Sequence, residues 1–220
     1  MNIILERVYN VCKSVQDLSP KITNFKKLIS LTRKAFAKHE FDLVIRTKKD
    51  KNLDWDNWYV VAYYDSDNDR SGEIAIEIIV YHNLTGTEDF GEHQIRLFLT
   101  EIFDATVHEY RHQYQSMRRD FVDYVEAVEH PYELYLANQD EMDAYAFSIA
   151  IELLRTMDAE RAKRRMGKIS VLSKMRTGSQ FSSPTLRAYI YHFGMCNITK
   201  RLAKKIYYHL ETVDKRHIFM

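Results

Sequence analysis

The sequence has few glycines and prolines, which interrupt helices, few cysteines, which form disulfides, and no long apolar run. Only 6 Gly and 3 Pro occur in 220 residues, which favours a helix-rich protein with short connections. The two cysteines, Cys12 and Cys196, are too few for a disulfide framework or a cysteine-based zinc site, and this predicts a reducing, cytoplasmic compartment. No run of 18 apolar residues occurs, so we expect no membrane partner. The opening residues MNIILER mix an acid and a base, so we expect no export signal.

The composition is that of a folded chain with an uneven distribution of charge. Hydrophobic residues make up 45% of the chain, enough for one sizeable core or two small ones. The net charge of +1 conceals a charge of +11 in residues 155–205 and of −10 in residues 1–154. These opposite charges either attract each other within the fold or make residues 155–205 a surface for nucleic acid or another acidic partner.

Apolar periodicity predicts an α+β chain. Residues 1–40 show helical spacing on both sides of Pro20, and residues 41–45, 58–64 and 73–81 read as three strands. The acidic segment 65–72 lacks the glycine and the glutamate of a calcium loop, so we interpret it as a polar hairpin turn. Further helices are predicted at about 92–117, 139–157 and 159–166, followed by a polar loop at 177–184 and a helix over roughly 186–210 that Gly194 breaks.

The helix predicted at 92–117 contains the motif His108-Glu109-Tyr110-Arg111-His112. Residues four apart lie on one face of a helix, so both imidazoles can reach one metal ion. Glu109 points to the side of that pair, where it can take a proton from water without being a ligand. The motif therefore predicts a zinc site in which His108 and His112 are two ligands.

A catalytic zinc needs a third protein ligand and an open position for water. We favour Glu141 as this ligand, because it opens the helix predicted at 139–157 and has the small residue Ala144 on the next turn. His130 is the chief alternative, and Glu141 can also be a plain acid at a helix N-terminus. The downstream candidates considered are Glu126, Glu129, His130, Glu133 and Glu141.

These residues resemble the gluzincin metallopeptidases, which carry His-Glu-x-x-His on one helix and a glutamate ligand on the next. The segment Glu141-x-x-Ala144-Tyr145-x-Phe147 is similar to the Glu-x-x-Ala-Asn-x-Phe pattern of the ImmA/IrrE-type small zincins, except that Tyr145 replaces the usual Asn. The likeness covers about 75 residues, from the third strand to Leu154. It implies a Zn²⁺ cofactor, Glu141 as a zinc ligand, and a protein or peptide substrate.

The resemblance also implies where the substrate would bind. In this family an edge strand just before the metal helix pairs with an extended substrate, and residues 73–81 occupy that place in the chain. Further positions for supporting groups are less specific: Asp104 is placed to orient an imidazole, and the candidates for an oxyanion donor are Tyr189, Tyr191 and His192.

The sequence thus predicts one helix-rich zincin-like domain over residues 1–220. It consists of N-terminal helices at 1–40, a catalytic core with a small three-stranded sheet at 41–157, and a basic helical region at 158–220. The predicted function is peptide-bond hydrolysis by a zinc-activated water, with Glu109 as the general base. The alternatives are a module whose metal is structural and whose residues 155–205 bind nucleic acid or protein, and a protease recruited to nucleoprotein through the same segment.

Overall fold

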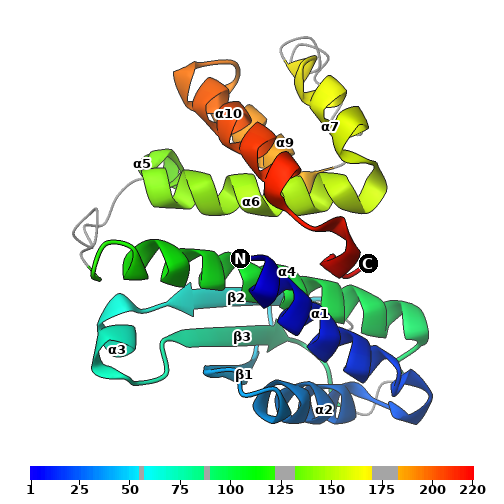
Figure 1. Cartoon of the computed structure of the whole chain (residues 1–220). Helices are drawn as coiled ribbons and strands as arrows, with labels where there is room; N and C mark the ends of the chain where they lie inside the picture. Colours follow the sequence, from blue (N-terminus) through cyan, green and yellow to red (C-terminus); the bar gives the residue numbers. More distant parts are fainter. Residues whose placement is uncertain (55–56, 87–89, 122–131, 170–182) are drawn as a thin grey trace. The chain divides into compact units, whose positions relative to one another are not determined.

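A computed structural model describes residues 1–54, 57–86, 90–121, 132–169 and 183–220. It shows a helix-rich α+β fold that divides into two compact units (Figure 1). Unit 1 comprises Met1–Val122 together with Phe219–Met220, and unit 2 comprises Asp123–Ile218. The boundary between the units lies between the two helices that are predicted to share the metal ion. That the whole chain forms one domain stays a prediction.

Unit 1 contains a small mixed sheet and the helices packed around it. Its strands are β1 (Leu43–Lys49), β2 (Trp58–Tyr64) and β3 (Ile76–His82), in the order β1-β3-β2. β3 pairs in parallel with β1 and antiparallel with β2. The predicted strands are confirmed, but β3 lies at the centre of the sheet. The prediction that residues 73–81 form an edge strand for substrate is therefore wrong, because both sides of β3 are already hydrogen-bonded.

The helices of unit 1 follow the predicted apolar spacing. The predicted ones are α1 (Asn2–Gln16), α2 (Phe25–Lys38) and α4 (Glu92–Met117), and the short polar helix α3 (Ser66–Ser71) was not predicted. α4 packs along β2 and β3 and against α1, whereas α2 lies beside β1 (Figure 1). The polar segment after β2 does connect two antiparallel strands, but it forms the short helix α3, because the Asp65 carboxylate accepts hydrogen bonds from the Asp67 and Asn68 amides.

α4 is the helix on which the histidine motif lies, and its local interactions explain its length. It contains no Gly or Pro, and Gln94 Oε1 accepts a hydrogen bond from the Gly91 amide at 2.9 Å, which closes its first turn. One side of the helix is fully buried in the core and consists of Phe98, Leu99, Ile102 and Phe103. Burial of each such side chain contributes about 1.5–3 kcal/mol, so this face holds the motif on a rigid element.

Unit 2 is built around the central helix α6 (Gln139–Thr156). The helices around it are α5 (Tyr132–Ala137), α7 (Ala159–Met166), α9 (Pro184–Phe193) and α10 (Asn197–Thr212) (Figure 1). The break at Gly194 is confirmed, since Gly194 has a positive φ of 56° and separates α9 from α10. Most of the polar loop predicted at 177–184 lies outside the described residues, and α5 was not predicted. In the described part of the chain, none of the helices is long and apolar enough to cross a membrane.

Candidate metal centre

The two histidines of the motif face each other on α4. Their Nε2 atoms lie 3.2 Å apart and their ring centroids 4.9 Å apart. Two nitrogens at about 2.0–2.1 Å from a tetrahedral zinc ion are themselves separated by about 3.3–3.4 Å. The spacing of the His108 and His112 nitrogens therefore fits two ligands of one such ion, which is the arrangement that the sequence predicted for this pair.

The tautomer of His112 is set by a residue that the sequence analysis missed. His112 Nδ1 lies 3.1 Å from Gln115 Oε1, and an amide oxygen can only accept a hydrogen bond. His112 therefore donates from Nδ1, and the lone pair of the neutral ring is on Nε2, the atom that faces His108. Gln115 is buried with 9% exposure, as expected for a group that orients a metal ligand.

Glu109 is also held within the protein. Its side chain is only 7% exposed, whereas a glutamate on a solvent-facing helix position is normally well exposed. A buried carboxylate is costly unless it has polar partners, so this burial is unusual for a residue without a specific role. The sequence places Glu109 directly after His108, and the structure places both on the same rigid turn of α4.

The predicted third ligand, Glu141, lies in unit 2, in the first turn of α6. Asn138 caps this helix by accepting a hydrogen bond from the Asp140 amide at 2.8 Å, and a carboxylate is favoured there by the helix dipole. The structure thus brings His108 and His112 together within unit 1 and holds Glu141 on an ordered helix start in unit 2. Of the rival ligands, Glu126, Glu129 and His130 lie outside the described residues.

Two tyrosines accompany Glu141 in unit 2. Loss of water around the Tyr135 hydroxyl raises its pKa, and the nearby charge of Glu141 raises it further, as do hydrogen bonds with Glu141 and Tyr145. Tyr135 therefore stays protonated and can donate to a carboxylate. Tyr145, which stands where the resembled family has Asn, belongs to this cluster, and its ring packs against Tyr189 at 5.6 Å. The sequence analysis did not find Tyr135.

The candidate oxyanion donors have other positions in the structure. Tyr189 is 1% exposed and donates its hydroxyl hydrogen bond to the Leu136 carbonyl oxygen at 2.9 Å, so it is a core residue of unit 2. Tyr191 is 88% exposed on α9, and His192 beside it is exposed as well. The assignment of an oxyanion donor among these three residues stays a prediction.

A pair of acids precedes the histidines on α4. Burial raises the pKa of Glu101 to about 7, and the charge of Asp104 raises it as well. Glu101 is therefore about half protonated near neutral pH. Asp104, which the sequence suggested as a partner for an imidazole, lies close enough to Glu101 for the two charges to interact.

No family model, no curated protein and no solved structure matches the chain.

Proposed function

We propose that the chain is a zinc-dependent metallopeptidase in which His108, His112 and Glu141 hold the metal ion. The observation that carries the proposal is the 3.2 Å separation of the two Nε2 atoms on α4. Two facts support it: Gln115 directs the His112 lone pair toward His108, and Glu141 is the first-turn carboxylate of the helix that the resembled family uses for its third ligand.

The residues of the motif have distinct roles in this proposal. A zinc ion bound there supplies a Lewis acid that polarises the scissile carbonyl and lowers the pKa of water. Glu109 accepts the proton of the attacking water and delivers it to the departing amine, which is general base and then general acid catalysis. Gln115 keeps the His112 ring in the orientation and tautomer that binding requires. The substrate class is a protein or peptide, in a reducing, cytoplasmic compartment.

Substitution of Glu109 separates catalysis from metal binding. Glu109→Gln should keep its zinc and lose roughly 10²–10⁴-fold in cleavage of a quenched fluorescent peptide library, because the amide cannot accept the proton. His112→Ala should lose both zinc and cleavage. Inductively coupled plasma mass spectrometry measures the zinc content, and the cleavage rate is measured on the same preparations. Full activity of Glu109→Gln would rule out the proposed mechanism.

The third ligand is tested separately. Glu141→Ala should lose most of the bound zinc, whereas Asp140→Ala, which removes the neighbouring first-turn acid, should keep it. Equal zinc in wild type and Glu141→Ala, with loss in His130→Ala, would assign the third position to His130 instead.

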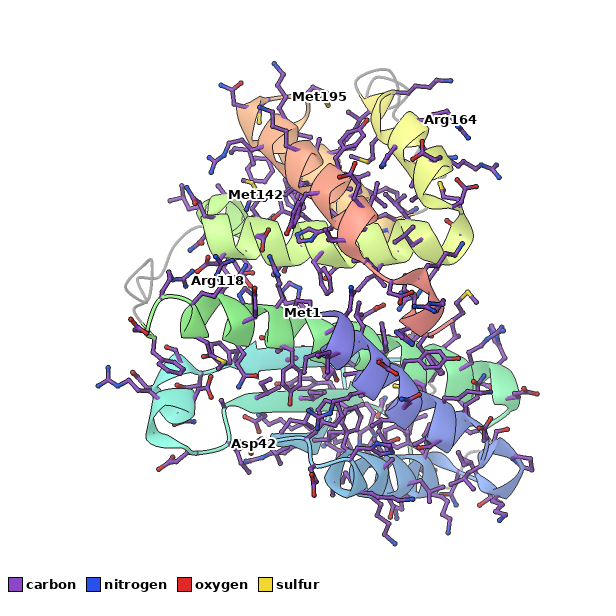
Figure 2. All side chains as sticks on the ribbon, viewed as in Figure 1. Met1, Asp42, Arg118, Met142, Arg164 and Met195 are labelled. Atoms are coloured by element: carbon purple, nitrogen blue, oxygen red, sulfur yellow. The ribbon has the colours of Figure 1, made fainter. Side chains whose placement is uncertain are left out.

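A second candidate function rests on the exposed cations of α7 and α10. Both helices present cationic side chains to solvent, as Figure 2 shows around Arg164: the exposed ones are Arg161, Arg164, Lys200, Arg201 and Lys204. They favour binding of nucleic acid or another acidic partner, alone or as the recruitment surface of the peptidase. The salt dependence of DNA and RNA binding tests this. Affinity that falls steeply with salt supports it, and binding no tighter than to an uncharged polymer at low salt contradicts it.

A further inference from the structure

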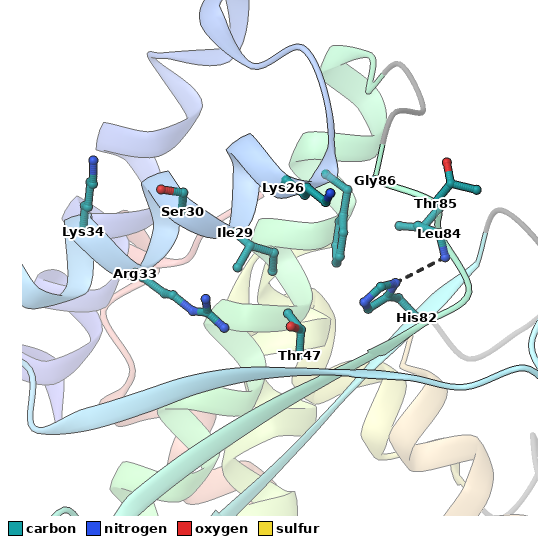
Figure 3. A pocket seen from close by; sticks show the side chains of 11 residues that line it. Lys26, Ile29, Ser30, Arg33, Lys34, Thr47, His82, Leu84, Thr85 and Gly86 are labelled. Carbon is teal, nitrogen blue, oxygen red and sulfur yellow. Dashed lines mark hydrogen bonds between the residues drawn. The ribbon is translucent and has the colours of Figure 1, made fainter.

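A pocket of about 500 Å³ opens in unit 1 between α2 and the ends of two strands (Figure 3). Thr47 lies near the carboxyl end of β1, and His82 is the last residue of β3. These strands are parallel, so their carboxyl ends lie at the same edge of the sheet. Ligands of α/β sheets commonly bind at this edge, and the volume is in the usual range for small-molecule sites, roughly 300–1,000 Å³.

The inner part of the pocket is apolar. Phe25, Ile29 and Leu84 line it and are 2%, 4% and 3% exposed. The Phe25 ring packs against the His82 imidazole with 4.7 Å between ring centroids. His82 Nδ1 accepts a hydrogen bond from the Leu84 amide at 3.2 Å, so the neutral ring carries its proton on Nε2 and is a hydrogen-bond donor there. This part suits the flat or apolar body of a ligand.

The outer part of the pocket is cationic. Lys26, Arg33 and Lys34 line it, and among the described lining residues there is no Asp or Glu. Within the described part of the chain, no carboxylate lies within 4.0 Å of these three cations. Figure 3 shows these side chains along α2, with Ser30 between Lys34 and Lys26, and with Arg33 directed toward the strand that carries Thr47. The charges are therefore available to an anion from outside.

Two of the cations lie close to the backbone that borders the pocket. Arg33 Nε donates to the Ile45 carbonyl oxygen at 2.8 Å, which fixes the guanidinium beside β1. Gly86 has a φ of +92°, and a Cβ at this position would lie 2.7 Å from Cε of Lys26. The positive φ favours glycine, and the loop backbone at this position lies close to the Lys26 side chain. Lys26 also belongs to the first turn of α2, where the helix dipole favours an anion.

We propose that this pocket binds a small organic phosphate ester whose body is aromatic or apolar, of the class of a nucleoside monophosphate. Lys26, in the first turn of α2, and the Arg33 guanidinium, further along the same helix, attract the phosphate, and the apolar inner wall takes the body of the molecule. The site is separate from the histidine motif, so it is a binding function in addition to the proposed peptidase activity.

Isothermal titration of the full chain with adenosine monophosphate tests the proposal. We expect saturable 1:1 binding, at least tenfold tighter than that of adenosine or of inorganic phosphate. Benzoate, an aromatic carboxylate, should also bind at least tenfold more weakly. Absence of saturable binding by adenosine monophosphate would overturn the proposal, and so would equally tight binding of adenosine, inorganic phosphate or benzoate.

Substitutions locate the binding in the pocket. Lys26→Met/Lys34→Met removes two charges but keeps the aliphatic stems, and should weaken adenosine monophosphate binding at least tenfold. Lys27→Met/Lys38→Met removes two charges from exposed positions of the same helix that do not line the pocket, and should leave the affinity within twofold. Equal weakening in both double variants would show charge attraction alone and would overturn the assignment of the pocket.

Discussion

His112 Nδ1 and Gln115 Oε1 lie 3.1 Å apart on successive turns of α4. This contact fixes the proton of His112 on the nitrogen that faces away from His108 and leaves the other nitrogen ready for a metal ion. Such partners of ligating histidines commonly contribute 10–100-fold to metal affinity. The helix that carries the motif therefore also carries the residue that orients it.

Gln115→Leu should weaken zinc binding by about 10–100-fold, because the ring loses the acceptor that sets its tautomer. Gln115→Glu, which keeps a side-chain acceptor at this position, should bind zinc close to the wild-type level. Competition with a fluorescent zinc chelator measures both. Equal affinities for wild type and Gln115→Leu would show that the contact has no part in a metal site.

The raised pKa of Glu101 predicts that stability falls as pH rises from about 4.5 to about 7. In this interval the folded protein holds a proton on Glu101 that the unfolded chain releases, so raising the pH favours unfolding. Above pH 7 the loss of unfolding free energy is complete, and it is on the order of 1–3 kcal/mol after allowance for solvent screening.

Glu101→Gln removes this titration and should unfold at a higher urea concentration than wild type at pH 8, but not at pH 4.5. Glu92→Gln, on an exposed position of the same helix, serves as the control and should follow wild type at both pH values. The prediction would be contradicted if the urea midpoint changed by the same amount between pH 4.5 and pH 8 in wild type and in Glu101→Gln.

Asp143 connects α6 to α10 within unit 2. Its Oδ1 atom lies 3.1 Å from Nε2 of the buried His209 and 3.3 Å from Nζ of Lys205. Asp143→Ala should lower the free energy of unfolding by about 1–3 kcal/mol, because it takes a hydrogen-bond partner from a buried group. Urea denaturation measures the change, with Asp140→Ala as the control on the same helix. A loss no greater than that of the control would contradict the prediction.

Phe219 belongs to the core of unit 1. It is 1% exposed and packs on Tyr9 and Phe103, each with ring centroids 6.3 Å away. Phe219→Ala should cost about 3–5 kcal/mol of unfolding free energy, because it leaves a cavity between α1 and α4. Met220→Ala, at a position that is 65% exposed, should change stability little. Thermal unfolding followed by circular dichroism distinguishes these outcomes, and equal midpoints would contradict the assignment.

The helices and strands were largely predictable because their signals are local. The bounds of α4 and the start of α6 match the predicted 92–117 and 139 closely, since uninterrupted apolar spacing and the lack of Gly or Pro define them. The break at Gly194 was found for the same reason. The short helix α3 was missed because its cap, Asp65, was interpreted only as part of a turn.

Strand order was not predictable in the same way, because it depends on pairing between distant segments. A signal was nevertheless present: Ile78, Ile79 and Val80 are consecutive apolar residues, and all three are buried. Such a run is typical of a strand covered on both faces, at the centre of a sheet. Gln115 and Tyr135 could not be found from motif spacing either, because each acts through a contact made by the folded chain.

The packing of Phe219 has a consequence for how the protein is made. Residues 123–218 are translated between two stretches that belong to the same core, so unit 1 completes its packing only after the ribosome has added residue 219. Until then, the aromatic residues that pack on Phe219 lack this contact. Nascent chains at this stage are the most exposed to aggregation or to binding by chaperones.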